Sequence, residues 1–139
     1  MQTLTDALRQ QHRRIEELAA AVTAAVLEHD ASRTMTQLLL FRDAVLEHLQ
    51  LEDTELYPRL LDAVGARSMH GRVVKSYATN MQRISESVKE FLGRQRAPLQ
   101  LATFEREWRD VMQMLTSRIQ SEERVLYPMY DQRLGFGGA

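Results

Sequence analysis

The sequence predicts an all-α protein, an up-down-up-down four-helix bundle, from three observations. Apolar residues recur at alternating spacings of three and four through most of the 139 residues, which is the period of amphipathic helices. No stretch shows the period-two alternation, bounded by turn residues, that is typical of strands. The four helical stretches are joined by short links, and short links favour antiparallel neighbours in a bundle.

The first half of the chain predicts two helices. The first is expected from about Thr5 to His29, with Thr3 or Thr5 as its N-cap, followed by a turn at residues 30–34. Its apolar stripe consists of Leu4, Leu8, Ile15, Leu18, Val22 and Val26. The second helix is expected to fade past Pro58, because proline disrupts the helical hydrogen-bond ladder. Its stripe consists of Leu38, Phe41, Val45, Leu56 and Leu60.

The second half predicts two more helices after Gly65. The third is expected to end near Gly93, with Pro98 in the next link. Its stripe consists of Val74, Tyr77, Met81, Ile84, Val88 and Phe91, and that of the fourth of Phe104, Trp108, Val111, Leu115, Val125 and Met129. Residues 1–134 are expected to form this single domain, and residues 135–139 a flexible tail.

Composition narrows the function classes. With 18 basic and 19 acidic residues the net charge is near zero, so no nucleic-acid or membrane-surface partner is expected. The absence of cysteine excludes disulfides, thiolate metal sites and a cysteine nucleophile. No signal peptide and no membrane-spanning run is recognisable, which favours a cytoplasmic protein. Phosphate-binding loops and nucleophile motifs are also absent, so an enzyme is not the expectation.

A repeated segment suggests two related halves. The first copy is HLQLEDTELYP, residues 48–58, and the second is RIQSEERVLYP, residues 118–128. In the first copy His48 and Glu52 lie four apart, a spacing that puts both on one face of a helix. In the second copy the glutamate is Glu122, but the histidine is replaced by Arg118.

Polar residues interrupt the apolar stripes of the predicted helices. They are His12 on the first, His48 and Glu52 on the second, and Arg118 and Glu122 on the fourth, with Tyr77 and Met81 as milder features of the third. A polar residue on a core face needs a partner or a purpose. Two imidazoles and two carboxylates from facing helices are the ligand type of iron, manganese or zinc sites in bundles.

These residues resemble the hemerythrin-like, or HHE cation-binding, four-helix bundles. The resemblance spans Leu8 to Pro128, and its pattern is a first-helix histidine, a His-x-x-x-Glu and a Leu-Tyr-Pro, repeated in the second half. It implies that His12 and His48 bind one iron and that Glu52 and Glu122 bridge it to a second. The chain departs from the pattern at the second iron, where the expected histidines correspond to Met81 and Arg118, and Tyr77 replaces an additional one.

The hypothesis is therefore a site for one metal ion, formed by His12, His48, Glu52 and Glu122, with iron favoured over manganese or zinc. Open coordination positions would suit sensing, small-ligand binding or metal handling. Arg118 would replace the second metal electrostatically, and its charge would repel one. Tyr77 and Met81 are both expected to pack in the core, with Tyr77 as a ligand, or as a hydrogen-bond partner of one, left as the alternative.

Alternatives remain open at the level of sequence. Arg118 can instead pair with both glutamates in a metal-free bundle that acts as an interaction or regulatory module. A protein partner or a homodimer would suit the wide apolar arc formed by Leu39, Leu40, Leu46 and Leu49. Haem held by His12 and Met81 is disfavoured by the many interior carboxylates. Glu123 is expected at the surface or beside a ligand, and His29 and His70 in solvent.

Overall fold

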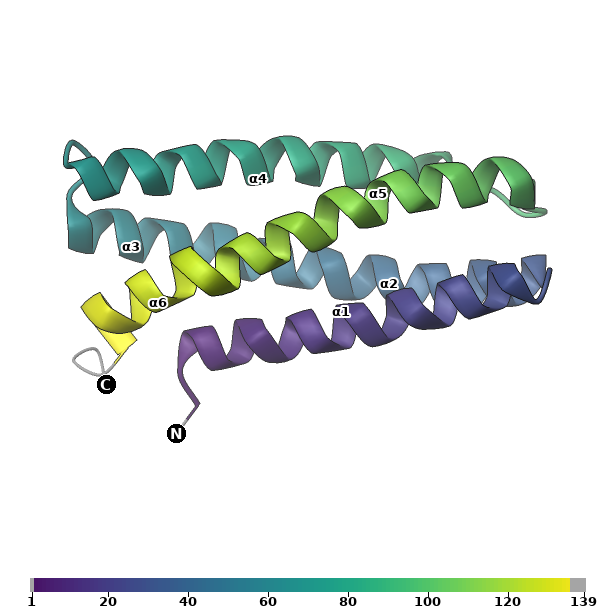
Figure 1. The fold of residues 1–139 in the computed structure, drawn as a ribbon, viewed down its shortest axis with the longest axis horizontal. Helices are drawn as coiled ribbons and strands as arrows, with labels where there is room; N and C mark the ends of the chain where they lie inside the picture. Colours follow the sequence, from purple (N-terminus) through teal and green to yellow (C-terminus); the bar gives the residue numbers. More distant parts are fainter. Residues whose placement is uncertain (1, 136–139) are drawn as a thin grey trace.

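A computed structural model describes residues 2–135 of the chain, which contain helices and no strand. Four long antiparallel helices form the bundle (Figure 1): α1 (Leu4–Leu27), α2 (Ala31–Leu51), α4 (Met69–Arg94) and α5 (Leu101–Ser121). Both ends of the described chain lie at the same end of the bundle (Figure 1). The predicted all-α four-helix architecture is confirmed. Of the predicted tail, residues 136–139 lie outside the described residues.

Side-chain caps define the start of the first two helices. Thr3 forms a capping box with Asp6, as one of the two predicted N-caps. Asp30 caps α2 by accepting a hydrogen bond from the backbone N–H of Arg33 at 2.9 Å. The turn predicted at residues 30–34 was therefore too long, because the Asp30 cap allows the helix to begin at Ala31.

The prediction that the second helix fades past Pro58 was also wrong. A π-helical turn at Glu52–Leu56 leads without a break into α3 (Tyr57–Val64). The Tyr57 N–H donates to the Glu52 carbonyl, five residues back, and Pro58 then occupies the first turn of α3, where its missing N–H is tolerated. The widened turn thus accommodates the proline.

The second copy of the repeat folds in the same way. A π-helical turn at Glu122–Leu126 leads into the short helix α6 (Tyr127–Tyr130), and a last π-helical turn covers Asp131–Gly135. The Tyr127 N–H again donates to the carbonyl of the glutamate five residues earlier. Each half of the chain therefore places a glutamate at the start of a π-helical turn and a tyrosine directly after the turn.

An aromatic cluster fills the end of the bundle that includes the link between α1 and α2. Trp108 packs edge-on against Phe41, with ring centroids 4.9 Å apart, and stacks on Phe104 at 5.8 Å. Its indole N–H donates to Thr23 Oγ1 at 3.1 Å. These aromatic side chains therefore pack at this end of the bundle, whereas the buried histidines and glutamates lie toward the opposite end.

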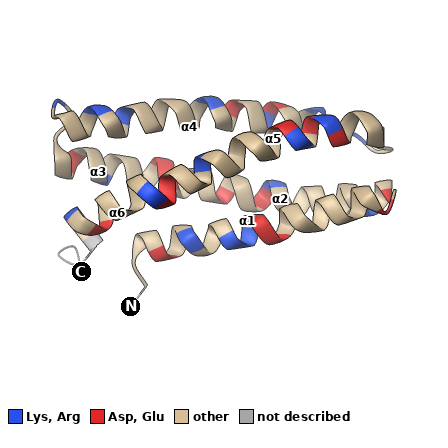
Figure 2. Ribbon diagram, viewed as in Figure 1, with Lys and Arg blue, Asp and Glu red and all other residues tan. Residues whose placement is uncertain are grey.

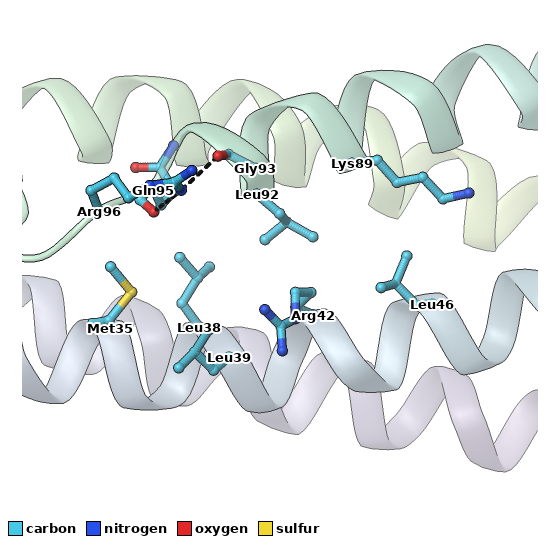
Figure 3. Close-up of a pocket in the computed structure, with 10 residues that line it drawn as sticks. All are labelled: Met35, Leu38, Leu39, Arg42, Leu46, Lys89, Leu92, Gly93, Gln95 and Arg96. Atoms are coloured by element: carbon cyan, nitrogen blue, oxygen red, sulfur yellow. Dashed lines mark hydrogen bonds between the residues drawn. The ribbon is translucent and has the colours of Figure 1, made fainter.

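The wide apolar arc of α2 divides between core and surface. Leu49 is buried, whereas Leu39 and Leu40 are 43% and 45% exposed. Leu39 and Leu46 line a groove of about 370 Å³ between α2 and α4 (Figure 3). Arg42, Lys89 and Arg96 also line it (Figure 3).

Charge is spread over the whole bundle. Figure 2 shows acidic and basic residues on each of the four long helices. None of the helices described in residues 2–135 is long and apolar enough to cross a membrane.

Candidate metal centre

Four polar residues from both halves of the chain meet inside the bundle. His12 comes from α1, His48 from the last turn of α2, and Glu52 and Glu122 from the starts of the two π-helical turns. All four are at most 2% exposed. Each offers one ligand atom, and these four atoms lie within 4.8 Å of one another, so the group can hold a metal ion. This is the set that the sequence predicted.

The separations between donor atoms fit a shared cation. Nε2 of His12 lies 3.0 Å from Nε2 of His48 and 3.4 Å from Oε1 of Glu122. Nε2 of His48 lies 3.4 Å from Oε2 of Glu52. Ligands about 2.1 Å from one metal ion are separated by about 3.0 to 3.5 Å at ordinary coordination angles. In addition, Oε1 of Glu52 is buried with no hydrogen-bond partner among the described residues, which leaves a carboxylate oxygen free to bind.

An outer residue lies beside the Nδ1 atom of each imidazole. The side-chain oxygen of Gln11 lies 2.9 Å from Nδ1 of His48, so Nδ1 carries a proton and Nε2 faces the centre. Oε1 of Glu123 lies 3.3 Å from Nδ1 of His12, an electrostatic contact that lacks good hydrogen-bond geometry. Glu122 therefore faces the site, while the partly exposed Glu123 lies behind a histidine.

Two tyrosines pair the halves across the centre. The Tyr127 hydroxyl donates to Oε2 of Glu52 at 2.8 Å, and its oxygen lies 3.0 Å from Nε2 of His12. The Tyr57 hydroxyl donates to Oε2 of Glu122 at 3.3 Å. Each tyrosine thus binds the glutamate of the other half. Burial, reinforced by the two glutamates, raises the pKa of both phenols, so they remain protonated donors.

Protons balance the charge of the metal-free centre. Burial and the neighbouring carboxylate of Glu122 raise the pKa of Glu52. Burial disfavours ionisation of Glu122 too, but hydrogen bonds from His12 and His48 outweigh it and lower the pKa of Glu122. Burial likewise disfavours the charged form of His48, yet Glu52 and Glu122 outweigh it and raise the pKa of His48 to about 9. A divalent cation would replace these protons and neutralise both carboxylates.

The residues at the second-metal positions lie apart from the carboxylates. Met81 is 2% exposed and packs in the core, as predicted. The guanidinium of Arg118 stacks over the Tyr77 ring, 4.5 Å from its centroid. Within residues 2–135 Arg118 forms no ion pair, so it does not build the predicted cluster with Glu52 and Glu122. Tyr77 is not a partner of the centre either, because its hydroxyl bonds to Ser121 Oγ at 2.8 Å.

Sequence reasoning missed three members of this site: Gln11, Tyr57 and Tyr127. The signal for the tyrosines was present, since each follows a glutamate of the repeat by five residues. Residues five apart do not share a face of an α-helix, and it is the π-helical turn that puts each tyrosine on the same face as the glutamate before it, so that both side chains enter the centre. Gln11 carried no signal apart from its place beside His12. His29 and His70 are exposed, as predicted.

The fold and donor set define a four-helix bundle with a buried histidine and glutamate site that can hold a metal ion. The family model described as the hemerythrin HHE cation binding domain matches residues 3–130. The chain belongs to this family, as its resemblance predicted. No curated protein and no solved structure matched the chain in the corresponding comparisons.

Proposed function

We propose that this protein binds one metal ion through His12, His48, Glu52 and Glu122. The observation that supports this most is the set of converging donor atoms, separated by 3.0 to 3.4 Å along its closest contacts and fully enclosed. A single ion is favoured because both histidines of the donor group come from the first half, while Met81 and Arg118 occupy the corresponding positions of the second. Among the described residues Arg118 forms no ion pair with the glutamates, so a metal ion would be the cation that compensates their charge.

Iron is the proposed metal, with manganese and zinc as the other outcomes of the test. Two imidazoles and one or two carboxylates with open positions suit iron, which would supply one-electron redox chemistry and a binding position for a small ligand. The chain itself supplies orientation and protons: Gln11 fixes the His48 ring, and the Tyr127 hydroxyl stands against Glu52 and His12. These features suit sensing, small-ligand binding or metal handling rather than turnover of a substrate.

Elemental analysis tests this proposal. The protein is purified without an affinity tag after iron supplementation, and its metal content and optical spectrum are measured. We expect about one iron per chain, and azide or nitric oxide added to it should change the spectrum if a coordination position is open. No bound metal, persisting after anaerobic reconstitution, would overturn the proposal.

A metal-free interaction module is the second candidate, and the exposed leucines of α2 favour it. Leu39 lines the α2–α4 groove of Figure 3, where a partner helix or a second copy can cover it, and Leu40, the next residue along α2, is also exposed. Light scattering of the purified protein, with Leu39→Gln/Leu40→Gln as the variant, separates this candidate from the first. A dimer that the variant dissociates would support it, and a monomer would count against the homodimer.

A further inference from the structure

The groove between α4 and α5 contains an unusual concentration of donors. It has a volume of about 440 Å³, and its polar lining residues are Asn80, Arg83, Ser117, Arg118 and Ser121. None of the residues that line it is acidic. Two arginines therefore line one groove together with residues that carry amide and hydroxyl groups.

Arg118 is held in place but its donors are little used. Its guanidinium stacks on Tyr77, and that ring is fixed by the hydrogen bond between its hydroxyl and Ser121. Nη2 reaches the Tyr77 carbonyl only at 3.5 Å, and Nε is buried without a partner among the described residues. A guanidinium with unpaired donors on a rigid platform is arranged to accept an anion.

Farther along the interface of α4 and α5, another arginine does have acidic partners. There Arg94 pairs with Glu90 at 3.2 Å and also with Glu107. In the part of the chain that the structure describes, neither Arg83 nor Arg118 has such an ion pair. Glu86, the acidic residue closest to Arg83 along α4, lines the separate pocket between α3 and α4. The interface of α4 and α5 thus supplies counter-charges in one part and none in the other.

We propose that Arg83 and Arg118 bind a phosphate-type oxyanion in the α4–α5 groove. The planar forks of the two arginines match phosphate oxygens, and Asn80 and Ser117 supply neutral donors beside them. The groove exceeds the volume of one phosphate group, so it also accommodates the phosphate of a larger molecule. The proposal requires no metal at the centre and survives if none is found.

Isothermal titration calorimetry of the metal-free full chain tests it, with inorganic phosphate as one probe and adenosine monophosphate as the other. We expect saturable binding at one site, weakened about tenfold or more by Arg83→Gln and by Arg118→Gln, which is the effect of losing about 1.4 kcal/mol each. Arg94→Gln is the matched control and should bind as the wild type does. Tighter binding of adenosine monophosphate would identify a phosphate carried by a larger molecule; tighter binding of inorganic phosphate would identify the free ion.

Absence of saturable binding would overturn the proposal, and so would an equal loss in the Arg94→Gln control. Arg118→Lys addresses the case in which Arg118→Gln fails to fold. It keeps the charge but loses the fork, so we expect an affinity between those of the wild type and Arg118→Gln. Unchanged affinity in a folded Arg118→Lys and in Arg83→Gln would likewise overturn the proposal.

Discussion

In the first half of the chain α1 and α2 each direct a histidine at the carboxylates, whereas α4 and α5 carry Met81 and Arg118 at the matching positions. The backbone of the two halves does not differ in this way. Both have a buried glutamate, a π-helical turn and a buried tyrosine followed by proline. The backbone that positions the carboxylates is therefore alike in the two halves, although only the first half directs imidazoles at them.

The residues of the second half that match their counterparts in the first half are those that contact the first-half histidines. Glu122 lies beside His12 and His48, and Tyr127 binds Glu52 and contacts His12. The residues that differ, Met81 and Arg118, are not members of this donor group. The comparison shows that this donor group draws its residues from both halves of the chain, with both imidazoles from the first half and one carboxylate from each.

Removing the histidines should have the largest effect. We expect His12→Ala/His48→Ala to reduce bound metal from about one ion per chain to nearly none, because the two imidazoles provide both nitrogen ligands. The matched control is His29→Ala/His70→Ala, which removes two exposed histidines and should leave metal content unchanged. Elemental analysis with circular dichroism checks both variants. Stoichiometric metal in the folded His12→Ala/His48→Ala protein would sink the proposed ligand set.

Restoring histidines to the second half should make the halves alike. We expect Met81→His/Arg118→His to raise metal content above one ion per chain, since both glutamates are already in place. Arg118→His alone should add little, because Met81 still fills its side of the core. Metal titration followed by elemental analysis distinguishes the two variants. A second ion in neither of them would mean that other residues exclude it.

The two tyrosines should differ in their contribution to stability. Tyr127→Phe leaves Oε2 of Glu52 without its 2.8 Å donor, and the other oxygen of this carboxylate already has no partner among residues 2–135. We expect a loss of about 1–3 kcal/mol in the free energy of unfolding of the metal-free protein, whereas Tyr57→Phe removes a longer 3.3 Å bond and should cost about 1 kcal/mol. Urea denaturation measures both. A larger loss for Tyr57→Phe than for Tyr127→Phe would show that the hydrogen bonds to the glutamate of the other half are not the source of the stability that these tyrosines contribute.

Sequence reasoning predicted the bundle and the four donor residues because both follow from periodicity on α-helices. Leu8, His12 and Ile15 share one buried face of α1, and His48 in the last turn of α2 shares a buried face with Glu52 directly after that helix. The same reasoning failed where the period changes. The π-helical turns brought Tyr57 and Tyr127 into the site and carried the second helix through Pro58. It also failed for Arg118, because stacking on Tyr77 competes with pairing to a glutamate and periodicity does not decide between them.

The smallest predicted effect is a pH dependence that separates His48 from Arg118. The pKa of His48, raised to about 9 by the carboxylates that outweigh its burial, exceeds its ordinary value of 6.5. A group whose pKa is higher in the folded than in the unfolded protein contributes its full stabilisation at pH values below the unfolded-state pKa. This stabilisation is lost as the pH rises through the folded-state pKa. Urea midpoints of the chelated wild type should therefore fall between about pH 6.5 and 9, and those of His48→Gln should fall less. Arg118→Gln should keep the wild-type pH dependence, because Arg118 does not pair with the carboxylates. If the urea midpoint of that variant depended less on pH, the charge of Arg118 would have to act on the centre.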